Sequence, residues 1–258
     1  MTRANLAVER LTVRYGALEA VKELTVTFEA DAIIGVIGPN GAGKTTLLNA
    51  LSGFTHITSG TVQLGGTDLT DVSGEKRVAL GIVRTFQTAR LLEPESVFLN
   101  VALGCERNPQ PSVVEQALAF PRAWRARRRD VEATEEILDA LGLAQVASRS
   151  VNELPYATRR LVELARIFVV HPHVVLLDEP AAGADRLERE SISERLRAFH
   201  AGRPFMMIVV EHDVDFVRRL CGYAVAMDSG KLIASGTPDE VLAARAVREA
   251  YFGIKHDA

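Results

Sequence analysis

The segment Gly38-Pro39-Asn40-Gly41-Ala42-Gly43-Lys44-Thr45 decides the fold, because it matches the pattern G-x-x-x-x-G-K-[ST] at every specified position. The apolar run Ile33–Ile37 before it predicts a buried strand, and Thr45–Leu51 after it predicts a helix. Glycines in such a turn let backbone N–H groups face an anion, toward which the helix dipole also points its positive end. The sequence therefore predicts a phosphate-binding loop (P-loop) between a strand and a helix.

Two side chains of this loop carry its chemistry. We expect Lys44 to reach the β- and γ-phosphates of a nucleotide and the Thr45 hydroxyl to coordinate Mg²⁺. The plain alternative is a glycine-rich turn that matches the pattern by chance, which the strand–loop–helix context disfavours. The loop alone does not distinguish a kinase, a GTPase, a transporter motor or a DNA-repair ATPase.

Length and composition narrow the class of protein. The chain has 258 residues, 47% of them hydrophobic, which suits one large α/β domain or a domain with an inserted lobe. A net charge of −3 argues against a nucleic-acid partner, which would favour a basic surface. Cys105 and Cys221 lie far apart and suggest neither a disulfide nor a zinc site, so a reducing cytosol fits. The start of the chain does not resemble a signal peptide, and no apolar run is long enough to span a bilayer.

The flanking segments predict a mixed architecture. Alternating residues in 6–15 and 24–28 predict two antiparallel strands joined through 16–22, and 80–87 predicts a strand that ends in Gln87. Helical periods over 91–143 predict an inserted helical lobe, a weaker S-x-x-E helix start follows at 150–153, and 159–170 predicts a further helix. Further along, we expect strands at 61–64, 174–177, 205–210, 223–227 and 231–234, and helices at 131–141, 187–200 and from Pro238 onward.

Polar residues follow the predicted parallel strands, at the edge of a doubly wound sheet where ligands gather. Asp178 ends an apolar strand and can accept a Mg²⁺-bound water opposite Thr45, while Glu179 can orient and deprotonate a water that attacks the γ-phosphate. Gln87 can contact the metal or that water, and His212 can hydrogen-bond the γ-phosphate. Each has a plain alternative: surface acids, a capping glutamine and a structural histidine. Their combination with the P-loop favours the catalytic interpretation.

In this order and spacing the motifs resemble an ATP-binding-cassette (ABC) ATPase over nearly the whole chain. The resemblance implies a single domain, 1–258, in which a P-loop NTPase core (RecA-like, about 1–90 and 165–258) carries an N-terminal antiparallel β subdomain and an inserted α-helical subdomain (about 91–164). It also implies a D-loop at 181–185 and a transport-coupled ATP hydrolase. The implied ATP contacts are Tyr15 on the adenine and, from the P-loop, Asn40, Gly41, Gly43, Lys44, Thr45 and Thr46. The implied Mg²⁺ contacts are Thr45, Gln87 and Asp178, and the implied catalytic residues are Glu179, His212, Gln87 and Lys44. From the residues alone, Tyr15 is better explained as a packed turn tyrosine.

The resemblance also places a signature segment at 154–160, where the family most often has L-S-G-G-Q. In such ATPases this segment contacts the nucleotide on the P-loop of another domain, which assigns that contact to Pro155, Tyr156 and Ala157. Pro155 cannot offer the usual serine hydroxyl, and Ala157 places a Cβ where glycine lets the backbone approach phosphate. We therefore expect an asymmetric pair of ATP sites, with the competent site built on Lys44 and Glu179.

Several short segments of the sequence are similar to those of ATP-binding subunits of branched-chain amino acid importers. They are 81–87, the Leu-Pro-Tyr at 154–156, 178–183 and 250–253. The resemblance implies integral membrane permease subunits, a second ATPase chain in a heterodimer (a homodimer is also possible) and, indirectly, a solute-binding protein. It implies a peripheral protein at the cytoplasmic face of the membrane. Related urea, amide and lipopolysaccharide transport ATPases share much of this pattern. The alternative is a regulatory or scaffolding ABC protein with weak ATPase activity.

Overall fold

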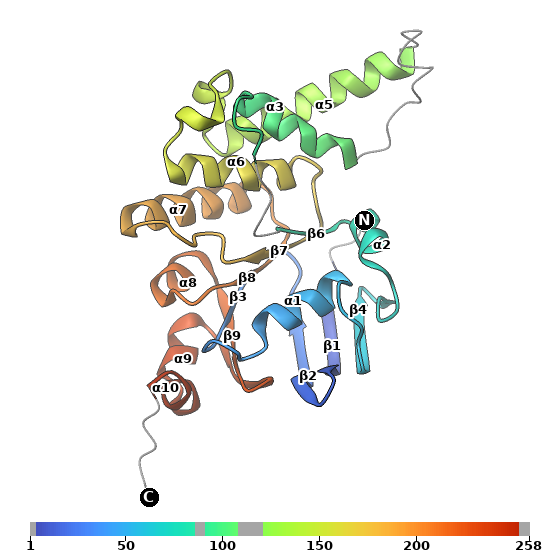
Figure 1. The fold of residues 1–258 in the computed structure, drawn as a ribbon, viewed down its shortest axis with the longest axis vertical. Coiled ribbons are helices and arrows are strands. Elements are labelled where there is room, and N and C mark those ends of the chain that lie inside the picture. The colour runs from blue at the N-terminus through green and yellow to red at the C-terminus, as the bar shows by residue number, and fades with distance from the viewer. Residues whose placement is uncertain (1–3, 86–90, 108–120, 253–258) are drawn as a thin grey trace, which may run out of the picture. The chain divides into compact units, whose positions relative to one another are not determined.

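The computed structural model describes residues 4–85, 91–107 and 121–252, and the chain divides into two compact units (Figure 1). The core unit comprises Met1–Thr85, His173–Pro180 and Arg203–Ala258, and the helical unit comprises Phe86–Pro172 and Ala181–Gly202. The boundaries inferred from the sequence assign 165–172 and 181–202 to the core instead. The structural division follows packing, since Phe168 stacks on Phe199 with ring centroids 4.8 Å apart.

A six-stranded sheet in the order β10-β9-β3-β8-β7-β6 forms the centre of the core unit. All adjacent pairs are parallel except β9 and β10. The strands that bear the predicted site, β3, β7 and β8, are buried along their whole length, as expected for parallel strands covered on both faces. The strand bounds are β3 Ile33–Ile37, β6 Ile82–Arg84, β7 Val174–Asp178, β8 Met206–Val210, β9 Tyr223–Asp228 and β10 Lys231–Gly236.

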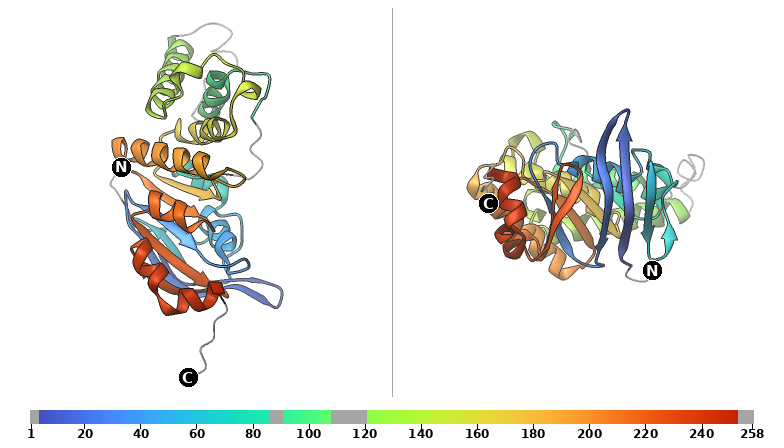
Figure 2. Two further views of the ribbon diagram at one scale, coloured as in Figure 1. Left: turned by 90° about the vertical axis from the view of Figure 1, so that its left-hand side faces the viewer. Right: turned by 90° about the horizontal axis from the view of Figure 1, so that it is seen from below.

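A second, antiparallel sheet has the order β2-β1-β4-β5, and its long strands β1 and β2 lie side by side in Figure 2. The predicted link over 16–22 is wrong, because β2 already begins at Leu18, opposite Tyr15. Bulges with positive φ at Arg10 and Glu23 shift the register and disturb the alternation that marks a strand in sequence. The bounds are β1 Leu6–Tyr15, β2 Leu18–Phe28, β4 Ser59–Leu64 and β5 Thr67–Asp68.

The helices of the core unit flank these sheets, and one buried apolar cluster joins both sheets to α1, the helix after the P-loop. The predicted strand at 80–87 is too long, because α2 is capped by Leu80 and Gly81 turns with φ 82° before β6 begins. The terminal helix is two helices, since Ala244 is extended between α9 and α10. The bounds are α1 Lys44–Ser52, α2 Gly74–Ala79, α8 Val214–Leu220, α9 Pro238–Ala243 and α10 Arg245–Phe252.

The helical unit contains no strand in its described part, as the sequence predicts. The S-x-x-E pattern forms only the 3₁₀ turn η3, and α6 begins at Tyr156 rather than at Arg159, because Pro155 takes the N-cap position. Over the described residues, no helix combines the length and the apolar composition required to cross a bilayer. The bounds are α3 Val97–Ala102, η1 Leu103–Arg107, α5 Pro121–Ala140, η2 Ala144–Val146, η3 Val151–Glu153, α6 Tyr156–Phe168 and α7 Arg186–Gly202.

Candidate nucleotide-binding site

The P-loop joins β3 to α1, as predicted, and its backbone depends on glycine at two points. A Cβ at Gly38, where φ is 151°, would lie 2.1 Å from the carbonyl oxygen of Met227. A Cβ at Gly43, where φ is 97°, would lie 2.4 Å from the carbonyl oxygen of Ala20. Both distances are far below van der Waals contact, so neighbouring backbone holds the loop in a shape that only glycine permits.

The N-terminus of α1 offers backbone donors to an anion. Gly43 provides no side-chain cap, and the first backbone bond of the helix runs from Leu47 N to Gly43 O over 2.9 Å. Within the described part of the chain, the N–H groups of Lys44, Thr45 and Thr46 therefore have no acceptor. Thr45 and, in the loop before it, Asn40 and Gly41 are exposed, so the donors open to solvent.

Lys44 is largely buried, and its ammonium group lies against its own loop. Nζ donates to the carbonyl oxygens of Gly38 at 2.7 Å and Pro39 at 2.9 Å, which leaves one of its three donors for a phosphate oxygen. Burial lowers the pKa of Lys44, while the charges of Glu179 and Asp178 oppose that shift. These carboxylates consequently lie within electrostatic reach of Lys44, as the sequence motifs suggested.

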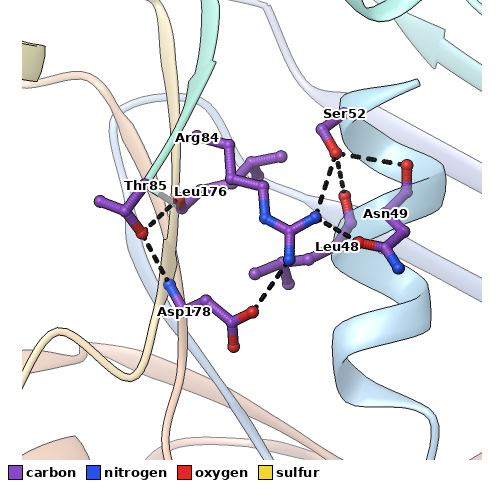
Figure 3. Close-up of polar contacts among 7 residues, drawn as sticks. All are labelled: Leu48, Asn49, Ser52, Arg84, Thr85, Leu176 and Asp178. Atoms are coloured by element: carbon purple, nitrogen blue, oxygen red, sulfur yellow. Dashed lines mark hydrogen bonds and ion pairs between the residues drawn. The ribbon is translucent and has the colours of Figure 1, made fainter. Parts of the chain in front are cut away.

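Asp178 ends β7 and is buried with a charged partner that the sequence interpretation missed. Arg84 Nη2 donates to Asp178 Oδ2 at 2.9 Å, and the backbone N–H of Asp178 donates to Thr85 Oγ1 at 3.1 Å (Figure 3). The sequence motifs include Arg84 only as part of the segment 81–87 and predict no role for it. The sequence signal for this partner was a charged residue directly after the apolar pair Ile82-Val83. That residue lies on the strand next to the one that carries Asp178.

Glu179 follows Asp178 directly and has a left-handed backbone, with φ 49°. Its N–H donates to Val210 O at 2.9 Å, and its Oε1 lies 3.7 Å from His212 Nδ1. That separation exceeds a hydrogen bond but requires only a small adjustment to become one. His212 also lies 3.8 Å from Glu211 Oε2 and has more than half of its side chain exposed. The structure therefore brings Glu179 and His212 together at the solvent-facing side of the site.

Tyr15 ends β1 with about half of its surface (48%) exposed. Its hydroxyl lies 3.0 Å from Thr55 Oγ1, which fixes the ring while a face stays open to solvent. This geometry favours the interpretation of a projecting aromatic face over that of a packed turn tyrosine. Gln87 lies outside the described residues.

A second residue that the sequence interpretation missed supports the start of the P-loop. The backbone N–H of Gly38 donates to the hydroxyl oxygen of Tyr251 in α10 at 2.8 Å. Burial raises the pKa of Tyr251, and the bond from Gly38 opposes the shift. Tyr251 lies 213 positions from Gly38 in the chain, so no local pattern points to the contact.

The signature segment is described within the helical unit alone. Pro155 is the exposed N-cap of α6 and supplies no side-chain cap, and Ala157 is half-buried in the first turn. Tyr156 is partly exposed, and its hydroxyl donates to the carbonyl oxygen of Ala182 in the D-loop. The segment therefore presents backbone and an anchored aromatic ring to solvent.

The donor set of the core unit fits Mg²⁺ rather than a softer metal. In the described residues, no group of three or more His, Cys, Asp or Glu side chains could enclose a metal ion. Mg²⁺ needs no such enclosure, because it keeps several waters and uses one or two protein oxygens together with phosphate oxygens. The Thr45 hydroxyl and the Asp178 carboxylate are oxygen donors of that kind.

Comparison with known proteins agrees with this geometry. A family model described as ABC transporter matches residues 21–182. The chain belongs to the ABC transporter ATPase family. A second model, described as branched-chain amino acid ATP-binding cassette transporter, matches residues 231–257 of this ABC ATPase.

Full-length relatives and solved structures support the same assignment. The chain is 32% identical over 253 residues to the high-affinity branched-chain amino acid transport ATP-binding protein BraF of Pseudomonas aeruginosa, covering 98% of this chain and 99% of BraF. It is 31% identical to the corresponding LivG of Escherichia coli, with the same coverage. A crystal structure of an ABC transporter cassette in its ADP conformation superposes with TM-score 0.83 at 28% identity, covering 98% of this chain and all (100%) of the other. A nucleotide-free cassette gives TM-score 0.81 at 28% identity, covering 96% and 98%.

These findings confirm the fold class, nucleotide binding and ATPase activity predicted from the sequence. They favour a transport ATPase over the regulatory or scaffolding alternative, since the matching family and the relatives are transport proteins.

Proposed function

We propose that this ABC ATPase is the ATP-hydrolysing subunit of an importer for branched-chain amino acids or a related small polar solute. The observation that carries the ATPase role is the grouping of Lys44, Asp178, Glu179 and His212 with the open N-terminus of α1. The solute class is supported by the names of the relatives and by the family model that matches residues 231–257.

Each group of the site has a role in binding. Tyr15 stacks on the adenine, and the P-loop donors with Lys44 hold the phosphates. Thr45 and Asp178 would hold Mg²⁺, which when bound would neutralise charge on the phosphate oxygens, and we assign Gln87 to the same metal or to the attacking water. Asn40, Gly41, Gly43 and Thr46 complete the phosphate loop.

Hydrolysis needs a water in line with the γ-phosphate and an acceptor for its proton. Glu179 accepts that proton as the water oxygen attacks phosphorus and the bond to the ADP oxygen breaks. His212, 3.7 Å from Glu179, contacts the γ-phosphate and holds the carboxylate in place.

The proposed importer is a complex of several chains. Integral membrane permease subunits carry the solute, a solute-binding protein delivers it, and a second ATPase chain pairs with this one at the cytoplasmic face of the membrane. Pro155, Tyr156 and Ala157 contact the nucleotide bound by that partner ATPase. We expect a heterodimer with one fully competent site, and no nucleic acid.

Glu179→Gln tests the catalytic assignment in the complex purified from membranes. Because Gln cannot accept the proton, turnover should fall by about 100-fold or more while ATP binding persists. Glu194→Gln, on the exposed surface of α7, is the matched control and should retain turnover. Full turnover in Glu179→Gln would rule out this residue as the base, and purification without any integral membrane protein would contradict the transporter assignment.

The asymmetry is tested at the signature segment. Ala157→Gly combined with Thr158→Gln restores two family positions, and the ATPase rate of the complex should rise because the altered segment limits the second site. An unchanged rate would show that these substitutions are tolerated and that the two sites do not differ for this reason.

A further inference from the structure

Arg84 forms an ion pair with Asp178 that is almost wholly buried. The exposed fractions of the two side chains are 9% and 3%, and Nη2 of Arg84 lies 2.9 Å from Oδ2 of Asp178. Removing two charges from water is costly, and such pairs often stabilise a fold no more than apolar residues of similar size would. Nε of Arg84 is also buried without a hydrogen-bond partner, which adds to the cost. Stability alone therefore explains this pair poorly.

The other end of the guanidinium group is attached to the helix that follows the P-loop. Nη1 of Arg84 donates to Oδ1 of Asn49 and lies 3.5 Å from Oγ of Ser52 (Figure 3). Ser52 Oγ in turn donates to Leu48 O at 2.6 Å, so its lone pairs are free to accept from Arg84. Arg84 thus bridges α1 and the end of β7 with one rigid, planar group.

The helical position of Asn49 connects this bridge to the proposed metal ligands. Asn49 follows Thr45 by four residues, so the two side chains lie on the same face of α1, one turn apart. Arg84 therefore ties Asp178 to the helix face that presents the Thr45 hydroxyl. A third residue, Arg84, thereby fixes the positions of the two protein groups assigned to Mg²⁺ relative to each other.

The remaining contacts of Asp178 leave one carboxylate oxygen available. Oδ2 accepts from Arg84, the last residue of β6, and the backbone N–H donates to Oγ1 of the next residue, Thr85, so two consecutive residues fix both the side chain and the main chain. Among the described residues, Oδ1 has no hydrogen-bond partner. A carboxylate fixed through one oxygen presents the other in a defined direction, which is what a metal-bound water requires.

We propose that Arg84 is a positioning residue for the magnesium of MgATP, which it serves by anchoring Asp178 Oδ2 to Asn49 on α1. Arg84 touches neither nucleotide nor metal in this role. The inference rests on the proposed Mg²⁺ site and adds the residue that sets its geometry.

The test compares ATP affinity with and without the metal. The dissociation constant of ATP is measured in EDTA and in excess Mg²⁺, and their ratio reports how much the metal strengthens binding. In Arg84→Met this ratio should fall at least about 5-fold, while the affinity in EDTA stays within about 2-fold because the P-loop donors are untouched. Arg84→Lys keeps the charge but cannot hold both partners with one planar group, so its ratio should be intermediate.

Asn49→Ala tests the anchor without burying an unpaired carboxylate. Its ratio should fall in the same direction as in Arg84→Met, by a smaller factor. Because both changes act through one guanidinium group, the double variant should fall no further than Arg84→Met alone. Independent, multiplicative effects on the ratio would show that Arg84 and Asn49 do not act through the same contact.

Arg77→Met is the matched control, because it also removes a buried arginine that contacts α1. Arg77 is also buried, but it donates only to backbone carbonyls, including those of Ala50 and Leu51 at the end of α1. Its loss should lower the melting temperature and leave the metal ratio unchanged.

The outcomes separate this inference from the proposed function. An unchanged or increased ratio in Arg84→Met, or an equal fall in Arg77→Met, would overturn the role of Arg84 while leaving the Mg²⁺ site intact. If Arg84→Met does not fold, Asn49→Ala decides, and an unchanged ratio there has the same meaning. A wild-type ratio of one would instead contradict the magnesium site itself.

Discussion

The substitution Tyr251→Phe removes a single oxygen atom and should loosen the P-loop at its first residue, Gly38. The Tyr251 hydroxyl accepts a hydrogen bond from Gly38 N over 2.8 Å, and the carbonyl of Gly38 accepts one from Lys44 Nζ over 2.7 Å. The peptide groups of Gly38 therefore link α10 to Lys44, the residue that we assign to the phosphates. Without the hydroxyl, the Gly38 N–H lacks an acceptor, and its backbone is less well fixed for nucleotide.

The magnitude follows from the burial of the two partners. An unpaired, fully buried donor costs about 1–3 kcal/mol, and the lower end applies because Tyr251 is only partly buried, so that water can reach the site. If the full cost of about 1 kcal/mol falls on the nucleotide-bound loop, ATP affinity decreases about 5-fold. This is an upper limit for the effect on binding.

Two measurements check the prediction: the dissociation constant of ATP, and the amide hydrogen exchange of the peptide that contains Gly38. Exchange there should accelerate by about the same 5-fold, since it reports local opening. Tyr223→Phe is the matched control because Tyr223 is exposed at the start of β9. If Tyr251→Phe matches this control in both affinity and exchange, the contact does not support the P-loop and the reasoning is wrong.

Three further predictions concern the P-loop, the two cysteines and the start of α9. Gly38→Ala places a Cβ 2.1 Å from the carbonyl oxygen of Met227, so ATP binding should be lost and the melting temperature should fall. Burial raises the pKa of both thiols, Cys105 and Cys221, so the native protein should react with a thiol reagent at pH 8 far more slowly than the unfolded protein, which should take up two equivalents. Thr237→Ala removes the hydroxyl that accepts from the Glu240 N–H in the α9 capping box, while the bond from the Thr237 N–H to the Glu240 carboxylate remains, and should lower the free energy of unfolding by about 1 kcal/mol in denaturant titration.

Features carried by local patterns were predictable from the sequence. The P-loop between β3 and α1 depends on glycines and an apolar strand that lie next to each other in the chain. Asp178 and His212 were placed at strand ends because apolar runs precede them, and the parallel order of β7 and β8 confirms that arrangement. These inferences need only the period of a strand and the rule that ligands gather at carboxyl ends.

Long-range contacts were not predictable in the same way. The partners of Arg84 lie 94 and 35 positions away, at Asp178 and Asn49, and Tyr251 is farther still from Gly38. Only the folded sheet brings these side chains together, so a single sequence gives no period or spacing that marks them. The early start of β2 was missed for a local reason, since the bulges at Arg10 and Glu23 interrupt the alternation.

The residue at which α6 begins determines which backbone N–H donors the unusual signature segment keeps. The first backbone bond of the helix joins Arg159 N to Pro155 O at 3.0 Å, so the N–H groups of Tyr156, Ala157 and Thr158 lie in the uncapped first turn. Pro155 removes a side-chain hydroxyl, and Ala157 adds a Cβ, but neither removes these donors or the positive end of the helix dipole. In the proposed ATPase pair, the nucleotide on the other chain should therefore still bind with reduced affinity, and restoring Gly and Gln should raise the ATPase rate by improving a weak site rather than by creating one.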